Sequence, residues 1–152
     1  FSDVDFAARC SEIIGKYQFA RELLIFEITE SAMIRDFAVA DRNIHVLKNM
    51  GIRISLDDFG VGFTSFFDIQ KYQFDGLKLD KSLIDNLGTD PGDVILRAMI
   101  RVGHDLGITV MAEGVEKEEQ VRLLREMHCD VIQGFHFYQP VPVWEARRKI
   151  ME

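Results

Sequence analysis

The sequence predicts an α/β fold in which about five parallel strands alternate with helical crossovers. Two observations support this. Short apolar runs that end in polar residues alternate with longer segments whose apolar residues recur every three or four positions. Strands joined through helices pair in parallel, either as a doubly wound sheet or as part of a barrel. The chain of 152 residues fits one domain with a real core.

The expected helices each present one apolar face. They cover residues 3–17, 38–50, 64–71, 90–106, 117–127 and a last segment from Val143. Thr64 or Ser65 opens the third helix, and Asp90 is the expected N-cap of the fourth, ahead of Pro91.

The expected strands are short apolar runs. They cover residues 23–29, 52–56, 76–80, 108–112 and 130–137. The second of them alternates apolar with polar residues and then breaks at Asp57 and Asp58, two adjacent carboxylates. A loop follows with Gly60 and Gly62, where the backbone can take positive φ or let a ligand approach closely.

Every expected strand carries polar residues at its carboxyl end. They are Glu27, Glu30, Asp57, Asp58, Lys78, Asp80, Glu113, Glu116 and Gln133. In barrels and open parallel sheets, active sites are built at that end. Glu27 and Lys78 are costly to bury inside apolar strands unless they are paired or bound to a metal. For Lys78, an internal salt bridge and a catalytic role both stay open.

Several carboxylates with one lysine suit hydrolysis of a phosphate ester with divalent metal ions. Oxygen ligands select Mg²⁺ or Mn²⁺, and two such ions would clamp the attacking and leaving oxygens. Taken alone, Asp57 and Asp58 would be a strand end that caps the next helix, but acids on the other strands favour the metal site. An enolase-like barrel with a lysine base would use the same residues.

Composition excludes several classes of protein. A net charge of −7 argues against nonspecific nucleic-acid binding, so no DNA partner is expected. The sequence contains no apolar run that would span a bilayer and no signal peptide. Cys10 and Cys129 lack metal-type spacing, which suggests reduced thiols in a cytoplasmic protein.

The chain opens at Phe1 rather than Met, which suggests a piece of a longer protein. That longer protein could be membrane-anchored outside this segment.

Five motifs occur in order along nearly the whole chain: F-E-I-T-E-S (26–31), L-D-D-F-G-V-G (56–62), D-G-L-K-L-D-K (75–81), A-E-G-V-E (112–116) and Q-G-F (133–135). Together they resemble the EAL domain. Members of that family hydrolyse cyclic di-GMP to linear pGpG on a modified TIM barrel. The resemblance implies a partial TIM-type (βα) barrel, two bound ions of Mg²⁺ or Mn²⁺, and a role in bacterial signalling.

The resemblance also implies roles for individual residues. Glu27 and Asp57 would bind the first metal ion, and Asp57 and Asp58 would hold the second, with Asp57 bridging. Lys78 would orient the metal-bound water, and Glu113 would serve that water as a base or bind the second ion.

Further motif residues would support this site. Gln133 would position it and Glu116 would support it, while Glu30 would steady the loop of Phe59, Gly60 and Gly62. In the family that loop links the site to dimerisation and regulation. Three loop residues depart mildly from the family pattern: Val61, Phe63 and Phe66. Four cations are open as phosphate partners: Arg35, Arg53, Lys81 and Arg101.

One departure is larger, because the E-A-L tripeptide and the following Asn strand are absent. We expect residues 1–152 to be a single EAL-type domain truncated at its N-terminus, with about three barrel strands and two ligands of the first metal missing. The open edge could promote pairing. The truncated chain alone is expected to be weakly active or inactive.

The expected partners are cyclic di-GMP, a second copy in a homodimer, and sensor or GGDEF domains in the parent protein. The alternative function is a non-catalytic cyclic di-GMP receptor or protein-interaction module on the same scaffold.

Overall fold

The structure, a computed structural model, describes residues 3–34, 37–62 and 64–151. Its centre is a five-stranded sheet in which every neighbouring pair is parallel and the strand order follows the chain, β1-β2-β3-β4-β5. The strands are β1 (Ile25–Thr29), β2 (Arg53–Phe59), β3 (Gly76–Leu79), β4 (Thr109–Ala112) and β5 (Val131–Ile132).

The strand order decides between the two architectures that the sequence leaves open. A doubly wound sheet reverses its strand order at a switch point, with helices on both faces. Here each strand lies beside its predecessor in the chain, so the crossovers wind in one direction and the sheet is an arc of a barrel. The expected α/β fold with five parallel strands is confirmed.

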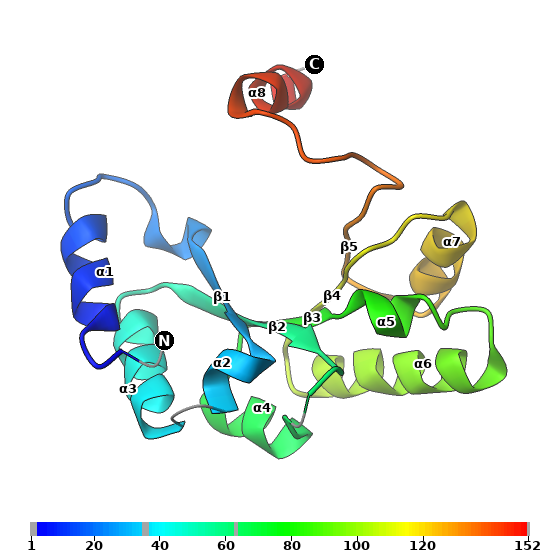
Figure 1. Ribbon diagram of the computed structural model, residues 1–152, viewed down its shortest axis with the longest axis horizontal. Coiled ribbons are helices and arrows are strands. Elements are labelled where there is room, and N and C mark those ends of the chain that lie inside the picture. Colours follow the sequence, from blue (N-terminus) through cyan, green and yellow to red (C-terminus); the bar gives the residue numbers. More distant parts are fainter. Residues whose placement is uncertain (1–2, 35–36, 63, 152) are drawn as a thin grey trace.

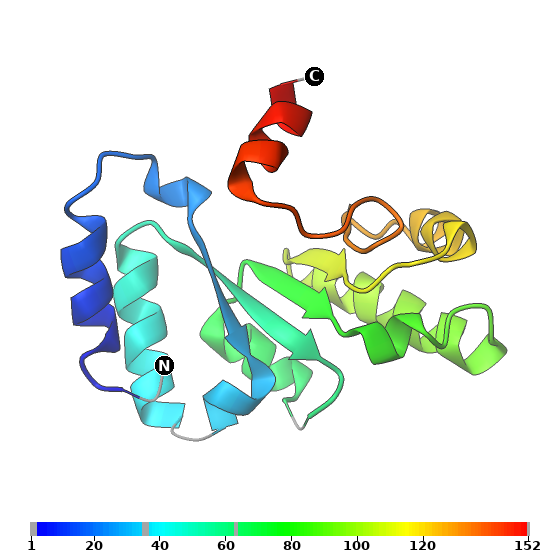
Figure 2. The ribbon, with the colours of Figure 1, turned by 45° about the horizontal axis from the view of Figure 1, so that its top comes forward.

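The longer helices lie along the outer side of this arc (Figure 1). They are α1 (Phe6–Ile14), α3 (Phe37–Asn49), α4 (Phe66–Tyr72), α6 (Asp90–Asp105) and α7 (Glu118–Glu126). Three shorter elements were not expected: a 3₁₀ turn at Arg21–Leu23, α2 (Glu30–Ile34) and α5 (Lys81–Ile84). The last helix, α8 (Val143–Met151), stands apart from the sheet at the end of an extended segment (Figure 2).

The core lies between the sheet and its outer helices. The strands supply fully buried Leu56, Leu77, Leu79 and Val110, and the helices supply residues such as Leu124. This packing makes the strands rigid supports for whatever side chains project from their ends.

Several expected boundaries are corrected by the structure. The strand expected to break at Asp57 continues through Asp58 to Phe59, which is buried in the core instead of lying in the loop. Only Val131 and Ile132 of the expected strand 130–137 are paired. The N-cap of α6 is Thr89 instead of Asp90, because the Thr89 side chain accepts a hydrogen bond from the backbone of Gly92.

The expected helix start at Thr64 or Ser65 is confirmed at Ser65, which opens α4 with a capping box formed with Asp68. Cys10 and Cys129 form no disulfide in the structure, and their reduced state stays a prediction. None of the described helices has the length and apolar character needed to cross a membrane. Arg35 and Phe63 lie outside the described residues.

Candidate active site at the carboxyl ends of the strands

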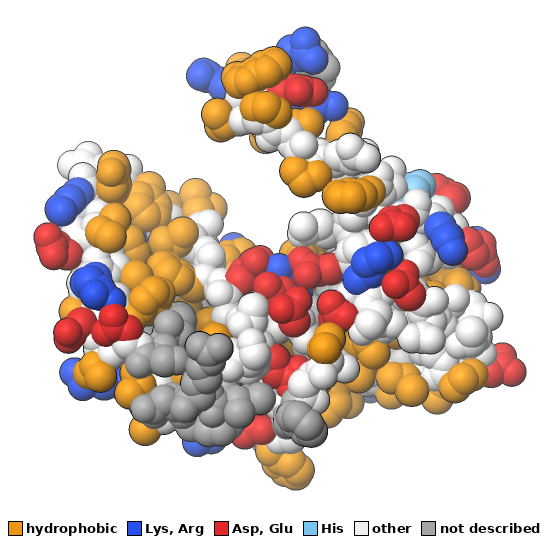
Figure 3. All heavy atoms as spheres, in the orientation of Figure 1, with side chains coloured by type: hydrophobic (Ala, Val, Ile, Leu, Met, Phe, Trp, Pro, Cys, Tyr) orange, Lys and Arg blue, Asp and Glu red, His pale blue; other side chains and the backbone are white. Residues whose placement is uncertain are grey.

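The site is organised around the ammonium group of Lys78 in β3. Its Nζ lies 2.8 Å from Glu27 Oε2, 3.0 Å from Asp57 Oδ1 and 2.8 Å from Glu113 Oε1. These carboxylates come from β1, from β2 and from the residue after β4, so four neighbouring strands converge on one cation. Figure 3 shows acidic side chains gathered over the middle of the sheet around a basic one.

Lys78 remains charged although its side chain is only 6% exposed. Burial by itself would lower the pKa of a lysine, but the facing carboxylates of Glu113, Glu27 and Asp57 favour its charged form and hold the pKa of Lys78 above its ordinary value. The structural and the catalytic interpretation of Lys78 are therefore compatible. The same salt bridges that stabilise the fold also place a positive charge inside the candidate site.

A β-bulge brings the two adjacent aspartates to the same place. Successive residues of a regular strand point to opposite faces of the sheet. Asp58, however, has φ of +57°, and the pairing of β2 with β3 shifts between Leu56 and Phe59. As a result, oxygens of Asp57, Asp58 and Glu113 all lie within 4.8 Å of one another.

This arrangement fits a divalent cation. Among the described residues, Asp57 Oδ1 is a buried side-chain oxygen that makes no hydrogen bond, although the Lys78 ammonium lies 3.0 Å away as an ion pair. Glu27, Asp57, Asp58 and Glu113 are gathered around one ammonium group, so negative charge is in excess there and a divalent cation would offset it. The donor set consists of carboxylate oxygens, which suit Mg²⁺ or Mn²⁺.

Burial is the main cause of two raised carboxyl pKa values, and neighbouring negative charges add to it. Burial and then the charges of Asp57 and Asp80 raise the pKa of Asp58 above 3.8. Burial raises the pKa of Glu113 above 4.5, and the nearby Lys78 offsets only part of the shift. In both residues the raised pKa widens the pH range over which a proton competes with a cation for the carboxylate.

Mn²⁺ affinity is therefore expected to fall as the pH is lowered, beginning above pH 4.5. Because the pKa of Glu113 is raised from 4.5, protons compete for its carboxylate at a pH where an ordinary glutamate is ionised. Calorimetric titration with Mn²⁺ between neutral pH and pH 4.5 measures this, and Glu113→Gln should flatten the dependence. Affinity that stays constant down to pH 4.5 would contradict the prediction.

Asp58→Asn is expected to stabilise the metal-free chain, raising Tm by about 1–2 °C. The variant removes one of four carboxylates around a single ammonium group, and asparagine tolerates the positive φ of this position. It should also abolish the rise in Tm that Mn²⁺ causes. Scanning calorimetry checks both effects, with Asp105→Asn in α6 as a control that should not raise Tm.

Glu30 binds the loop that follows β2. Its side chain is buried and accepts hydrogen bonds from the backbone of Gly62, at 3.0 Å, and of Thr64. A Cβ atom added at Gly62 would lie 2.7 Å from the Glu30 carboxyl carbon, so glycine is needed for this approach. Gly60 has φ of +106°, as glycine allows. The link to regulation stays a prediction.

The remaining candidate residues, Gln133, Glu116 and Asp80, lie around the Lys78 carboxylate cluster and are not part of it. Gln133 and Glu116 line a cavity of about 240 Å³ next to Glu113. Asp80 caps α5 by accepting a hydrogen bond from the backbone of Ser82. The carboxylate of Glu116 pairs with Lys81 at 3.2 Å.

The structure also shows where two further candidate phosphate partners, Arg53 and Arg101, lie. Arg53 is the first residue of β2, at the opposite end of the strand from the cluster, and donates to the carbonyl of Glu22. Arg101 pairs with Asp105 within α6.

The sequence analysis did not single out Gln120, a buried residue that follows the A-E-G-V-E motif. The one signal that could have indicated it was its position in the first turn of an expected helix.

Comparison with known proteins identifies the domain. The sequence profile of the EAL domain matches residues 1–140. The signaling protein YkoW of Bacillus subtilis is 38% identical over 153 residues, covering 100% of this chain and 19% of YkoW. A structure of the PaMucR phosphodiesterase in complex with c-di-GMP superposes with a TM-score of 0.88 at 29% identity, covering 95% of this chain and 59% of that chain.

A manganese and cyclic di-GMP complex of Klebsiella pneumoniae BlrP1 superposes with a TM-score of 0.83 at 27% identity, covering 91% of this chain and 36% of that chain. The chain thus spans 19% of YkoW and less than two thirds of each of these solved chains. The expected partial barrel is confirmed by these superpositions, and with the profile match they show that this chain belongs to the EAL domain family.

Proposed function

We propose that the domain to which this chain belongs hydrolyses cyclic di-GMP to linear pGpG with two divalent ions, Mg²⁺ or Mn²⁺. The observation that carries the proposal is the convergence of Glu27, Asp57 and Glu113 on Lys78, with Asp58 beside them. Two related proteins support the choice of substrate, because PaMucR and BlrP1 were solved with cyclic di-GMP, and BlrP1 also with manganese.

Two overlapping sets of carboxylates would hold the two ions. Glu27 and Asp57 would hold one ion, and Asp57, Asp58 and Glu113 supply oxygens close enough to hold another. When bound, such ions lower the pKa of water and neutralise charge on a phosphoryl group. The rigid strands that carry these residues keep the oxygens in place without a large rearrangement.

The pKa directions support different roles for Lys78 and Glu113. Lys78 stays protonated at neutral pH, so it acts as a donor that orients the attacking water and stabilises negative charge on the phosphate. Glu113 would either bind the second ion or accept the water proton, and its raised pKa makes it a stronger base than an ordinary glutamate. The water oxygen bonds to phosphorus, one P–O ester bond breaks, and the leaving oxygen takes a proton.

The isolated chain is proposed to turn over slowly, because it covers 59% of the PaMucR chain and leaves part of such a domain unrepresented. A homodimer, and sensor or GGDEF domains in the longer protein, stay predictions.

The test is an assay of cyclic di-GMP hydrolysis with Mn²⁺ or Mg²⁺, in which pGpG is followed by chromatography. This chain should show little turnover, and a chain extended on its N-terminal side through the E-A-L motif should show much more. Nucleotide binding without hydrolysis in the extended chain would contradict the proposal and indicate a non-catalytic receptor. Full turnover by the isolated chain would contradict the expectation that the extension is needed.

A further inference from the structure

The turn of residues 113–116 follows β4 directly, and its first residue is Glu113, whose carboxylate belongs to the candidate site. Its backbone is held between the neighbouring strands: the amide of Glu113 donates to the carbonyl of Leu79 at 3.1 Å, and the amide of Val115 donates to the carbonyl of Gln133 at 3.1 Å. Gly114 has φ of +67°, which favours glycine. The path of this turn therefore sets where the Glu113 side chain points.

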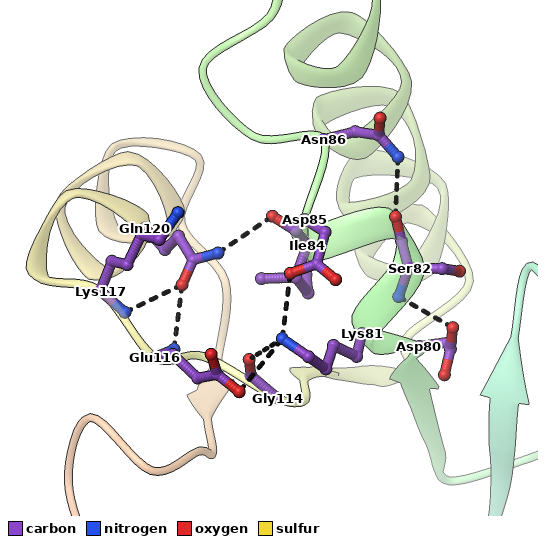
Figure 4. Close-up of polar contacts among 10 residues, drawn as sticks. All are labelled: Asp80, Lys81, Ser82, Ile84, Asp85, Asn86, Gly114, Glu116, Lys117 and Gln120. Atoms are coloured by element: carbon purple, nitrogen blue, oxygen red, sulfur yellow. Dashed lines mark hydrogen bonds and ion pairs between the residues drawn. The ribbon is translucent and has the colours of Figure 1, made fainter.

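Gln120 fixes the far end of that turn (Figure 4). Its side-chain oxygen accepts hydrogen bonds from the backbone amides of Glu116, at 2.9 Å, and Lys117, at 3.0 Å. Its side-chain nitrogen donates to the carbonyl of Ile84 in α5, at 3.3 Å. Gln120 is only 6% exposed, so loss of its amide would remove the hydrogen bonds that hold the Glu116 and Lys117 amides to this buried side chain. One side chain thus ties the turn to α5, which directly follows β3.

Lys81 is a second anchor on the same turn. Its ammonium lies 3.2 Å from Glu116 Oε1 and 3.0 Å from Asp85 Oδ1, and it donates to the carbonyl of Gly114 at 3.5 Å. Its stem covers Gly114, where an added Cβ would lie 2.6 Å from Lys81 Cγ. Exposed ion pairs are individually weak, and the Lys81 side chain is 44% exposed, so Gln120 is the stronger anchor.

We propose that Gln120 is a positioning residue that, with Lys81, holds the Glu113 carboxylate at the cation site beside Asp57 and Asp58. The inference rests on the proposed metal-dependent function and adds residues that do not themselves touch the cation or the substrate. Partners that orient a metal ligand from outside typically change metal affinity by about 10- to 100-fold when removed.

The test uses Gln120→Met, which keeps the length of the side chain and removes its amide. Calorimetry should show Mn²⁺ affinity about tenfold weaker than in the unmodified chain. The matched control is Asn43→Leu, because Asn43 is also a buried amide that donates to a distant backbone carbonyl, that of Asp3, away from the site. The control should lower Tm and leave Mn²⁺ affinity unchanged.

A double-mutant cycle separates positioning from general stability. In a Glu113→Gln background, Gln120→Met should weaken Mn²⁺ binding no further, because the ligand that it positions is already gone. Its effect on Tm should be the same in both backgrounds. Additive losses of affinity would overturn the inference.

Lys81 gives a second readout that does not depend on the folding of the Gln120 variant. Lys81→Met should weaken Mn²⁺ binding by about two- to fivefold, and Lys81→Arg should retain the affinity. Equal affinity in the unmodified chain and in every Gln120 and Lys81 variant would overturn the inference and leave the proposed function standing. Absence of Mn²⁺ binding in both the unmodified and the extended chain would contradict the proposed function, and the inference with it.

Discussion

Asp57→Asn is expected to weaken Mn²⁺ binding by at least about 100-fold and to abolish cyclic di-GMP hydrolysis. Asp57 lies beside the other acids, and its buried Oδ1 is paired with Lys78 without a hydrogen bond. Asparagine keeps the shape of the side chain but replaces a charged ligand with a neutral amide. Calorimetric Mn²⁺ titration and the chromatographic assay, the latter on the extended chain, measure the two losses.

The matched control is Asp75→Asn, which makes the same chemical change at the opposite end of the sheet. Asp75 accepts a hydrogen bond from the backbone of Ile54 at 2.9 Å and pairs with Lys48 at 3.0 Å, so its role is structural. The control should lower Tm and leave Mn²⁺ affinity intact. Equal Mn²⁺ affinity in Asp57→Asn and the unmodified chain would show that Asp57 is not a ligand.

Lys78→Met is expected to destabilise the metal-free chain by about 3 kcal/mol and to abolish hydrolysis. Removing one partner of a buried ion pair costs about 3–5 kcal/mol, and the lower end applies because the Glu27 side chain is 49% exposed. For a chain of this size the loss corresponds to a fall in Tm of about 6–12 °C. Methionine preserves the packing of the stem, so the effect reports the lost charge.

Added Mn²⁺ should restore more stability to Lys78→Met than it adds to the unmodified chain, because the ion replaces the lost cation among the carboxylates. The deficit in Tm should also shrink as the pH falls, since protonation neutralises the unpaired acids. Lys71→Met is the control, because Lys71 is exposed and lies over the Tyr72 ring away from the site. A Lys78→Met variant as stable as this control would contradict the prediction.

The sequence by itself determined the five strands, the longer helices and the charged residues that meet at the strand ends. Alternating apolar runs and amphipathic segments are local patterns, and polar residues at the carboxyl ends of parallel strands must gather at one edge of the sheet. That reasoning placed Glu27, Asp57, Lys78 and Glu113 together, and the distances between them agree.

Only the tertiary structure decided how these elements are arranged. The direction of winding depends on which strands pair, and such pairing is a non-local property that no local pattern encodes. The bulge at Asp58 depends on register with β3, so the expected break was instead a continued strand. Gln120 became visible as an anchor only when α7 packed beside α5, because its partner Ile84 lies 36 residues away in the chain.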